Sequence, residues 1–163
     1  MANEPEYPFT TFNFRVSIQV AGPTKLPLCA AEFSECDGME VNLEPKTIRE
    51  GGNNGRPIHL VGPVSYGQLT LKRGMTSDFG LWEWFEAVQG PGGSGVRASG
   101  EIGIMPEDPK ATRPKVAFKL TGCLPIKLKV PALSAKDGGL AIEELQIAYE
   151  TLSRVTSGTG GAR

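Results

Sequence analysis

The residues that could do chemistry in this chain are few, and their spacing does not support a catalytic site. His59 is the only histidine, and no motif around it supplies the orienting partner that general-base catalysis needs. Ser65 stands in the segment Pro-Val-Ser-Tyr-Gly, which lacks the first glycine of a nucleophile elbow and leads into a predicted strand rather than a helix. We therefore interpret His59 as a structural or surface residue, and we predict no catalytic residues and no enzyme activity.

Signals for a metal or a cofactor are equally weak. The cysteines are odd in number and have no CxxC spacing, which favours reduced structural thiols over a disulfide framework or a zinc site; they are Cys29, Cys36 and Cys123. The segment 90–95 matches GxGxxG, but it follows a predicted helix and precedes a predicted strand, the reverse of the order in dinucleotide-binding folds. The adjacent acids at 107–108 and 143–144 would point to opposite faces of a strand, so we interpret them as solvated charge. We expect no metal site and no cofactor.

The composition favours one β-rich domain and gives no sign of binding to nucleic acid or to an anionic membrane through net charge. The chain has 163 residues, of which 21 are glycine and 13 are proline, a content typical of many short strands joined by turns. Lys and Arg total 17 against 18 for Asp and Glu, so no net field draws in nucleic acid or an anionic membrane. No apolar run approaches the roughly 20 residues that cross a bilayer, which predicts no membrane segment.

The stretch from Val64 to Gly90 predicts one strand that leads into one helix. Polar and apolar residues alternate from 68 to 73, as in a half-buried strand. Thr76 or Ser77 could then cap a helix over residues 77–89, with Gly90-Pro91 ending it. The spacing places three residues of this helix in the core: Leu81, Trp82 and Phe85.

Other segments alternate with the period of strands. The strictest alternation covers 12–20, and further short strands are predicted at 29–35, 39–43, 98–104, 116–120 and 126–130. The segment 140–152 fits either a helix or a strand with a bulge at Glu143-Glu144, and its β-branched and aromatic content favours the strand. These patterns predict a mainly β fold with one flanking α-helix.

The long segment 44–63 shows no clear period. Loops of this length are uncommon inside a compact domain and are usually functional, so we expect something outside the domain to order it. Residues 1–11 are predicted to form an N-terminal arm and residues 153–163 a flexible C-terminal tail.

Several fragments, in this order, resemble the tail-tube proteins of contractile phages and of phage-tail-like injection systems. They are Phe14-Arg15-Val16, Phe33-Ser34-Glu35-Cys36-Asp37-Gly38-Met39-Glu40, Arg49-Glu50-Gly51-Gly52-Asn53, Leu69-Thr70-Leu71-Lys72-Arg73-Gly74, Leu81-Trp82-Glu83-Trp84 and Ala141-Ile142-Glu143-Glu144-Leu145. The resemblance implies that 12–152 is a single tube-forming β domain, a β-barrel or sandwich flanked by one α-helix, and that its last element is a strand. It also implies that six copies form hexameric rings stacked into a hollow inner tube.

The resemblance also implies partners and a location. The expected partners are other copies of the chain, sheath and baseplate proteins, and a luminal cargo of protein effector or DNA. An inter-subunit loop is implied at Glu50, Gly51, Gly52, Asn53, Asn54 and Arg56. The protein would be made and assembled in the bacterial cytoplasm and would be part of a phage virion or a phage-tail-like particle.

Two alternatives are compatible with the residues. One is a secreted ring-forming carrier that resembles the tube component of type VI secretion, and the presence of sheath and baseplate proteins in the same particle would exclude it. The other is a monomeric ligand-binding β-barrel, which predicts a stable monomer with an enclosed pocket.

Overall fold

A computed structural model describes residues 13–20, 27–29, 33–49, 51–52, 55–108, 110–136 and 138–155. The elements, in chain order, are β1 (Phe14–Val20), β2 (Pro27–Cys29), β3 (Glu35–Asp37), β4 (Val41–Ile48), β5 (Ile58–Tyr66), β6 (Gln68–Gly74), α1 (Gly80–Gln89), the 3-10 turn η1 (Gly93–Gly95), β7 (Ala98–Ile104), β8 (Val116–Lys129), β9 (Ile142–Ala148) and β10 (Thr151–Val155). The predicted arm at 1–11 and the residues beyond Val155 lie outside the described ranges. No helix among the described residues is long and apolar enough to cross a membrane.

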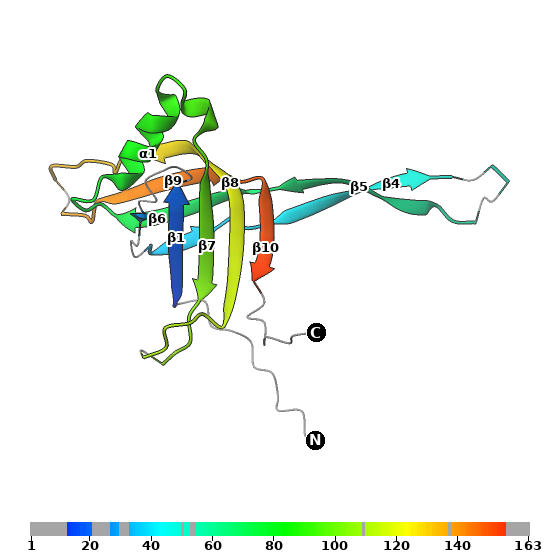
Figure 1. Ribbon diagram of the computed structural model, residues 1–163, viewed down its shortest axis with the longest axis horizontal. Helices are drawn as coiled ribbons and strands as arrows, with labels where there is room; N and C mark the ends of the chain where they lie inside the picture. The colour runs from blue at the N-terminus through cyan, green and yellow to red at the C-terminus, as the bar shows by residue number, and fades with distance from the viewer. Residues whose placement is uncertain are drawn as a thin grey trace.

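The body is a β sandwich whose two layers share one long strand. The strand order is β2-β1-β7-β8-β9-β6-β3, with β10 paired to β8 as well. The first half of β8 lies between β7 and β10, and its second half pairs with β9. Figure 1 shows β1, β7, β8 and β10 upright in one layer, β9 and β6 crossing them in the other, and α1 over one end. The mainly β prediction with one flanking helix is confirmed.

Gly122 allows β8 to pass from one layer to the other. Its φ is +64°, a left-handed conformation that costs glycine least. A Cβ there would lie 2.4 Å from the carboxyl group of Glu150, and the Glu150 N–H donates to the Thr121 carbonyl at 2.9 Å across the same corner. The two strands predicted at 116–120 and 126–130 are therefore one strand, because this corner interrupts the alternation without ending the ladder.

The core lies between the two layers and under α1. Alternate residues of the central strands point into it, as predicted for 14–20, 68–73 and 98–104. The buried apolar cluster comprises Val16, Ile18, Phe33, Leu69, Leu71, Leu81, Trp84, Ala98, Ile102, Leu120, Cys123, Leu145, Ile147 and Tyr149.

The segment 44–63 is not an irregular loop. Strands β4 and β5 pair over most of their length and form a long antiparallel hairpin that extends far from the body (Figure 1). Both faces of the hairpin meet solvent in the isolated chain, so its sequence carries no inward and outward alternation. The strands predicted at 29–35 and 39–43 are replaced by β2, β3 and β4, while the predicted break at Asp37-Gly38 is confirmed.

The helix begins later than predicted. Residues 76–79 form a turn, because the Gly80 N–H donates to Asp78 Oδ1 at 3.1 Å and the Asp78 carbonyl accepts from Arg73 Nη2 at 2.8 Å. Phe79 occupies the N-cap position without a side-chain cap. The α1 helix therefore runs over 80–89 rather than 77–89.

The prediction of the helix core is correct only for Leu81. Trp84 is 1% exposed and lies in the core, whereas Trp82 and Phe85 are only partly buried. Leu81 and Trp84 stand three residues apart and point the same way, and the face of Trp82 is rotated away from them. Trp84, not Trp82, is the tryptophan that α1 packs into the body.

The last segment is a strand with its break at a different place. Residues Ile142–Ala148 pair regularly with β6, without a bulge at Glu143-Glu144, and β9 ends at the bend before β10. The β10 strand runs to Val155, three residues beyond the predicted domain boundary. Glu143 is not solvated as predicted: it is buried, and Arg73 Nε donates to its Oε1 from the facing strand.

Candidate assembly surfaces

The projecting hairpin carries an uncovered apolar face. Leu43 faces Val64 and Pro45 faces Val61 across the two strands, with a register shift between these pairs, so all four side chains share one face. The exposed fractions of Leu43, Val64 and Val61 are 51%, 48% and 81%. A two-stranded ribbon in water is marginally stable by itself, and exposed apolar area of this kind marks an interaction site.

Tyr149 holds the root of the hairpin. Its hydroxyl lies 3.1 Å from the Gly38 carbonyl and 3.0 Å from the Glu40 carbonyl, and it accepts the Glu40 N–H at 3.0 Å. Its ring stacks at a tilt on Tyr66, with centroids 5.8 Å apart. Gly38 has a φ of +87°, and a Cβ there would lie 2.0 Å from the Gln68 carbonyl oxygen. The Tyr149 hydroxyl and the tight turn at Gly38 thus fix the direction in which the hairpin leaves the body.

Replacing Tyr149 by phenylalanine is expected to lower the free energy of unfolding by about 1–2 kcal/mol, because the partly buried Glu40 N–H loses its acceptor while the ring is kept. Chemical denaturation measures the loss, and hydrogen exchange at the Glu40 amide should accelerate. Tyr66→Phe is the matched control and should change stability by less than about 0.5 kcal/mol. Equal effects of the two substitutions would contradict the role given to the Tyr149 hydroxyl.

The hairpin tip holds the predicted inter-subunit loop. Gly51, Gly52 and Arg56 are exposed there, and Gly52 has a φ of +100°. Glu50, Asn53 and Asn54 lie outside the described residues. His59 is part of β5, where its Nδ1 lies 3.2 Å from Thr47 Oγ1 of the paired strand, which agrees with a structural role.

One face of the upright layer is polar across four strands. Ser17 faces Glu101, Glu101 faces Lys119, and Lys119 faces Ser153, which places these side chains in one row over β1, β7, β8 and β10. Ser17, Glu101 and Lys119 also line a shallow depression of about 260 Å³. The opposite face of the same strands carries Ile18, Ile102 and Leu120 of the core, so this layer is amphipathic.

Both edges of the polar layer are open among the described strands. β10 pairs only with β8, and β2 covers β1 only at Ile18 and Gln19. Because every neighbouring pair in the layer is antiparallel, β1 runs opposite to β10. Unpaired strand edges are templates for pairing with another chain.

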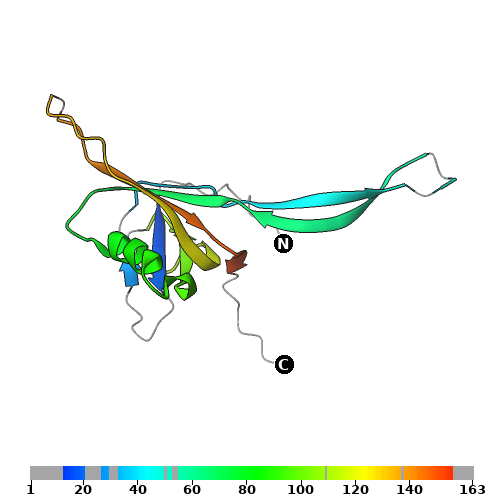
Figure 2. The ribbon, with the colours of Figure 1, turned by 90° about the horizontal axis from the view of Figure 1, so that it is seen from above.

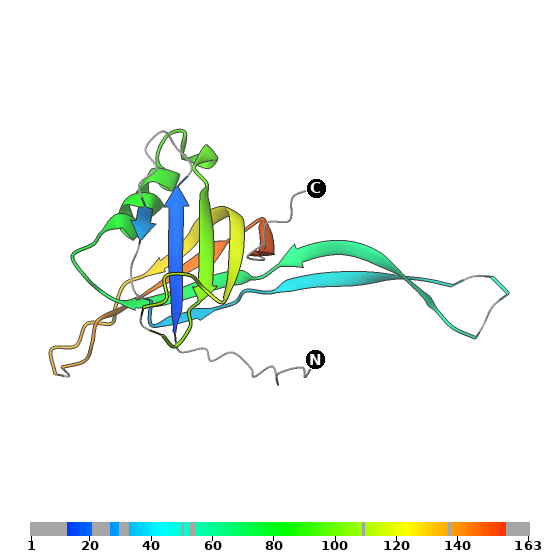
Figure 3. The same cartoon turned by 60° about the horizontal axis from the view of Figure 1, so that its bottom comes forward.

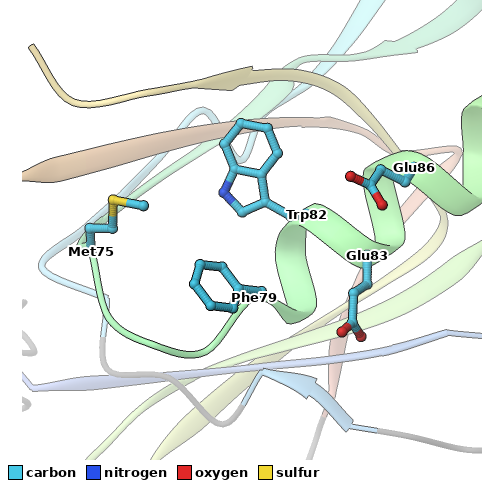
Figure 4. A pocket seen from close by; sticks show the side chains of 5 residues that line it. All are labelled: Met75, Phe79, Trp82, Glu83 and Glu86. Carbon is cyan, nitrogen blue, oxygen red and sulfur yellow. The ribbon is translucent and has the colours of Figure 1, made fainter.

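A second cleft lies on the exposed side of α1. It has a volume of about 390 Å³ and is lined by Met75, Phe79, Trp82, Glu83 and Glu86. Figure 4 shows the Trp82 indole and the Phe79 ring facing the same space as the Met75 thioether, with the two carboxylates along the helix beside them. Phe79 is 53% exposed, so the cleft is an open apolar surface with an acidic rim.

The two cysteines whose side chains the structure describes, Cys36 and Cys123, are not poised for reaction. Burial and, as the smaller cause, the negative charge of the neighbouring Asp37 together raise the pKa of Cys36 to about 11. Burial likewise raises the pKa of Cys123 to about 11, so both side chains stay protonated at neutral pH. The parts of the chain that the structure describes contain no cluster of histidine, cysteine and acidic side chains able to hold a metal ion.

Sequence reasoning missed Tyr149 and the cleft. Tyr149 stands at an inward position of the predicted last strand. Its hydrogen-bond partners, Gly38 and Glu40, precede it by 111 and 109 positions in the sequence, so no local pattern reveals them. The cleft joins the turn before α1 to the side of the helix opposite Trp84. In the sequence, the only indication of this cleft was the neighbouring pair Trp82 and Glu83.

Comparison with known proteins gives a consistent result. The family model of the T4-like virus tail tube protein gp19 matches residues 10–153. A chain in the structure of the anti-feeding prophage baseplate is 24% identical, with a TM-score of 0.76, and the match covers 92% of this chain and 97% of that one. No curated protein matches the chain in sequence.

Two further structures share the fold. A chain in the sheath–tube complex of the extracellular contractile injection system PVC, in its extended state, is 19% identical with a TM-score of 0.72, and 93% of each chain is covered. A chain in the tube-terminating cap of the anti-feeding prophage is 19% identical with a TM-score of 0.74, covering 96% of this chain and 97% of that one.

Proposed function

The chain belongs to the T4-like virus tail tube protein family, and we propose that six copies close into a ring and that the rings stack into the inner tube of a contractile injection system. A tail tube protein is a structural component of a phage or phage-tail-like particle, so the function is mechanical rather than catalytic. The tube is driven through a target envelope and conducts a cargo of protein or DNA.

The observation that best supports a ring is that β1 and β10, the edge strands of the four-stranded polar layer, are largely unpaired on their outer sides. An even number of antiparallel strands leaves β1 and β10 running in opposite directions. When β10 of one copy lies beside β1 of the next, the alternation of strand direction continues without interruption. Such head-to-tail contacts close into a ring when the rotation between copies allows it, and closure removes the unpaired edges.

The polar row supports a wet channel. In a closed ring of amphipathic strands, one face packs on the core and the other can line a water-filled lumen. The row of Ser17, Glu101, Lys119 and Ser153 is suited to the second role, because it mixes hydroxyls with both signs of charge. A wall of this kind gives a passing cargo no large apolar or single-sign surface to bind.

The hairpin supports contact between copies. The described body leaves its apolar face uncovered, and in a stacked tube a neighbouring copy would lie beside every subunit. We propose that the tip acts as the inter-subunit loop, with contacts from Glu50, Gly51, Gly52, Asn53, Asn54 and Arg56. The proposed further partners are the sheath and the baseplate, which occur with similar chains in the contractile structures above, and assembly is proposed to take place in the bacterial cytoplasm.

The proposal is tested by electron microscopy of particles sedimented from the producing cells, with gold-labelled antibody against this chain. We expect gold on exposed tube ends and on contracted rods. Tubes without sheath or baseplate proteins would favour the secreted carrier of the type VI kind. A chain found only in the soluble fraction, as a monomer with no labelled rods, would contradict the tube function and favour a ligand-binding barrel.

Changing Gly51 and Gly52 together to valine is expected to leave the monomer folded and to prevent stacking. Apart from the adjacent residues in the chain, no described atom lies within 4 Å of a Cβ built at either position, so the monomer has room. Valine nevertheless disfavours the φ of +100° at Gly52 and therefore alters the tip. Thermal unfolding and particle counts are the measurements. Gly138→Val with Gly139→Val is the matched control, because both positions are equally open; tubes of normal length from the tip variant would refute the loop assignment.

A further inference from the structure

The cleft on α1 has the chemistry of a site for a basic, partly apolar protein surface. From Met75 to Val96 the chain contains three acidic residues and no lysine or arginine. Glu83 and Glu86 stand one helical turn apart at the rim of the cleft, and the floor offers the faces of Trp82 and Phe79. An arginine side chain fits such a place, because its stem packs on apolar surface and its guanidinium stacks on aromatic rings and pairs with carboxylates.

The tip of the β4–β5 hairpin carries the complementary chemistry. Arg49 and Arg56 flank the glycine-rich turn, and both are exposed. Just behind them Ile48 faces Ile58 across the hairpin, and these side chains are 40% and 36% exposed. The tip therefore carries two apolar side chains next to two positively charged ones. This arrangement is complementary to the α1 cleft, whose surface is apolar and whose edge is acidic.

The two surfaces lie on opposite sides of the molecule. In all three views the hairpin tip points away from the side of the body that carries α1 (Figures 1, 2 and 3). A strand rises about 3.3 Å per residue, so the eight residues of β4 carry the tip about 26 Å from its root. The tip does not reach the cleft of its own chain, and a donor and an acceptor on opposite sides are what a head-to-tail contact between identical copies requires.

We propose that the hairpin tip of one copy docks into the α1 cleft of a neighbouring copy, with Arg49 and Arg56 against Glu83 and Glu86 and with Ile48 and Ile58 over Phe79 and Trp82. This docking rests on the proposed self-assembly and names the surface that receives the hairpin. It also gives a role to the outward aromatic side chains of α1, which the core does not use.

Charge reversal tests the docking. Three variants replace the wild-type chain in the cells that produce the particles: Arg49→Glu with Arg56→Glu, Glu83→Arg with Glu86→Arg, and all four changes together. Each two-site variant should lower the number of tubes per cell about tenfold or more, because like charges then meet at the contact. The four-site variant should return the number to within about threefold of the wild type, because the pairs are restored with opposite polarity.

The controls separate docking from folding and from net charge. Lys110→Glu with Arg113→Glu changes the net charge as the tip variant does, but on the exposed β7–β8 connection, and it should assemble normally. Thermal unfolding of each purified chain should stay near that of the wild type. A tip variant that assembles no worse than this control would overturn the docking.

The remaining outcomes are also decisive. If the α1 variant forms normal tubes but loses a basic protein that wild-type tubes retain, the cleft serves that partner and the docking is overturned while the tube function stands. Failure of the four-site variant to recover, with a folded monomer, would overturn the docking as well. A wild-type chain that enters no tube would overturn both the docking and the proposed function.

Discussion

Replacing Trp84 by alanine is expected to lower the free energy of unfolding by about 3–5 kcal/mol, the cost of removing a large aromatic side chain from a packed core. Trp84 is 1% exposed and is the largest side chain that α1 contributes to the body. Its loss leaves a cavity under the helix, which the helix cannot fill because Leu81 beside it is already fully buried. Urea or thermal denaturation of the purified monomer measures the effect.

Two variants on the same helix sharpen this result. Trp82→Ala should change stability by less than about 1 kcal/mol, because Trp82 lines an open cleft. Trp84→Phe should also cost less than Trp84→Ala, because phenylalanine keeps most of the ring and removes an Nε1 hydrogen that has no acceptor among the described residues. A larger loss from Trp82→Ala than from Trp84→Ala would contradict the orientation of α1.

Replacing Glu143 by alanine is expected to cost about 3 kcal/mol, since it removes the buried carboxylate beside Arg73 and leaves the guanidinium only the more exposed Asp78 carboxylate, whose Oδ2 lies 3.4 Å from Nη1. Both side chains are almost fully buried, and the guanidinium also donates to the Asp78 carbonyl at 2.8 Å. The pair therefore ties β6 and β9 to the turn that starts α1. We expect a lower melting temperature together with a loss of helical signal by circular dichroism.

The double variant Arg73→Met with Glu143→Leu is the informative control. Replacing both members of a buried ion pair by apolar residues of similar volume is often neutral or stabilising, so the double variant should recover much of the loss. Glu144→Ala, on the neighbouring position of β9, should have little effect because Glu144 is only partly buried and pairs weakly with Lys127 at 3.8 Å. A double variant no more stable than Glu143→Ala would contradict the explanation that the loss comes from the buried charge of Arg73.

The sequence predicted those elements whose two faces meet different surroundings. In strands β1, β6 and β7 apolar and polar residues alternate, because one side packs on the core and the other meets water. This alternation can be recognised in the sequence alone. The family resemblance resolved the last element as a strand, which periodicity left open. The order of strands and the path of β8 through both layers follow from pairings between distant residues, which no local pattern encodes.

Elements that the body leaves exposed, and residues whose partners are distant in the chain, were harder to predict. The β4–β5 hairpin was interpreted as a loop because both of its faces are exposed in the isolated chain and two prolines and a register shift interrupt its period. Trp82 was placed in the core because its spacing from Leu81 and Phe85 fits one apolar face of a helix, although it lines the cleft. Glu143 was assigned to solvent because its partner Arg73 is 70 positions away. Each error concerns a residue that the described body leaves at its surface or one whose partner is distant in the chain.

The prolines of the hairpin have a further consequence, for the solubility of the protein before it assembles. A long two-stranded ribbon with exposed valines and leucines is a natural seed for fibrous aggregates, because each of its edges can recruit another strand. Pro45 in β4 and Pro63 in β5 each remove one N–H from this ribbon and restrict how a foreign strand can pair along it. The hairpin can thus keep the apolar face that the proposed contact with a neighbouring copy needs, while its backbone resists uncontrolled strand addition.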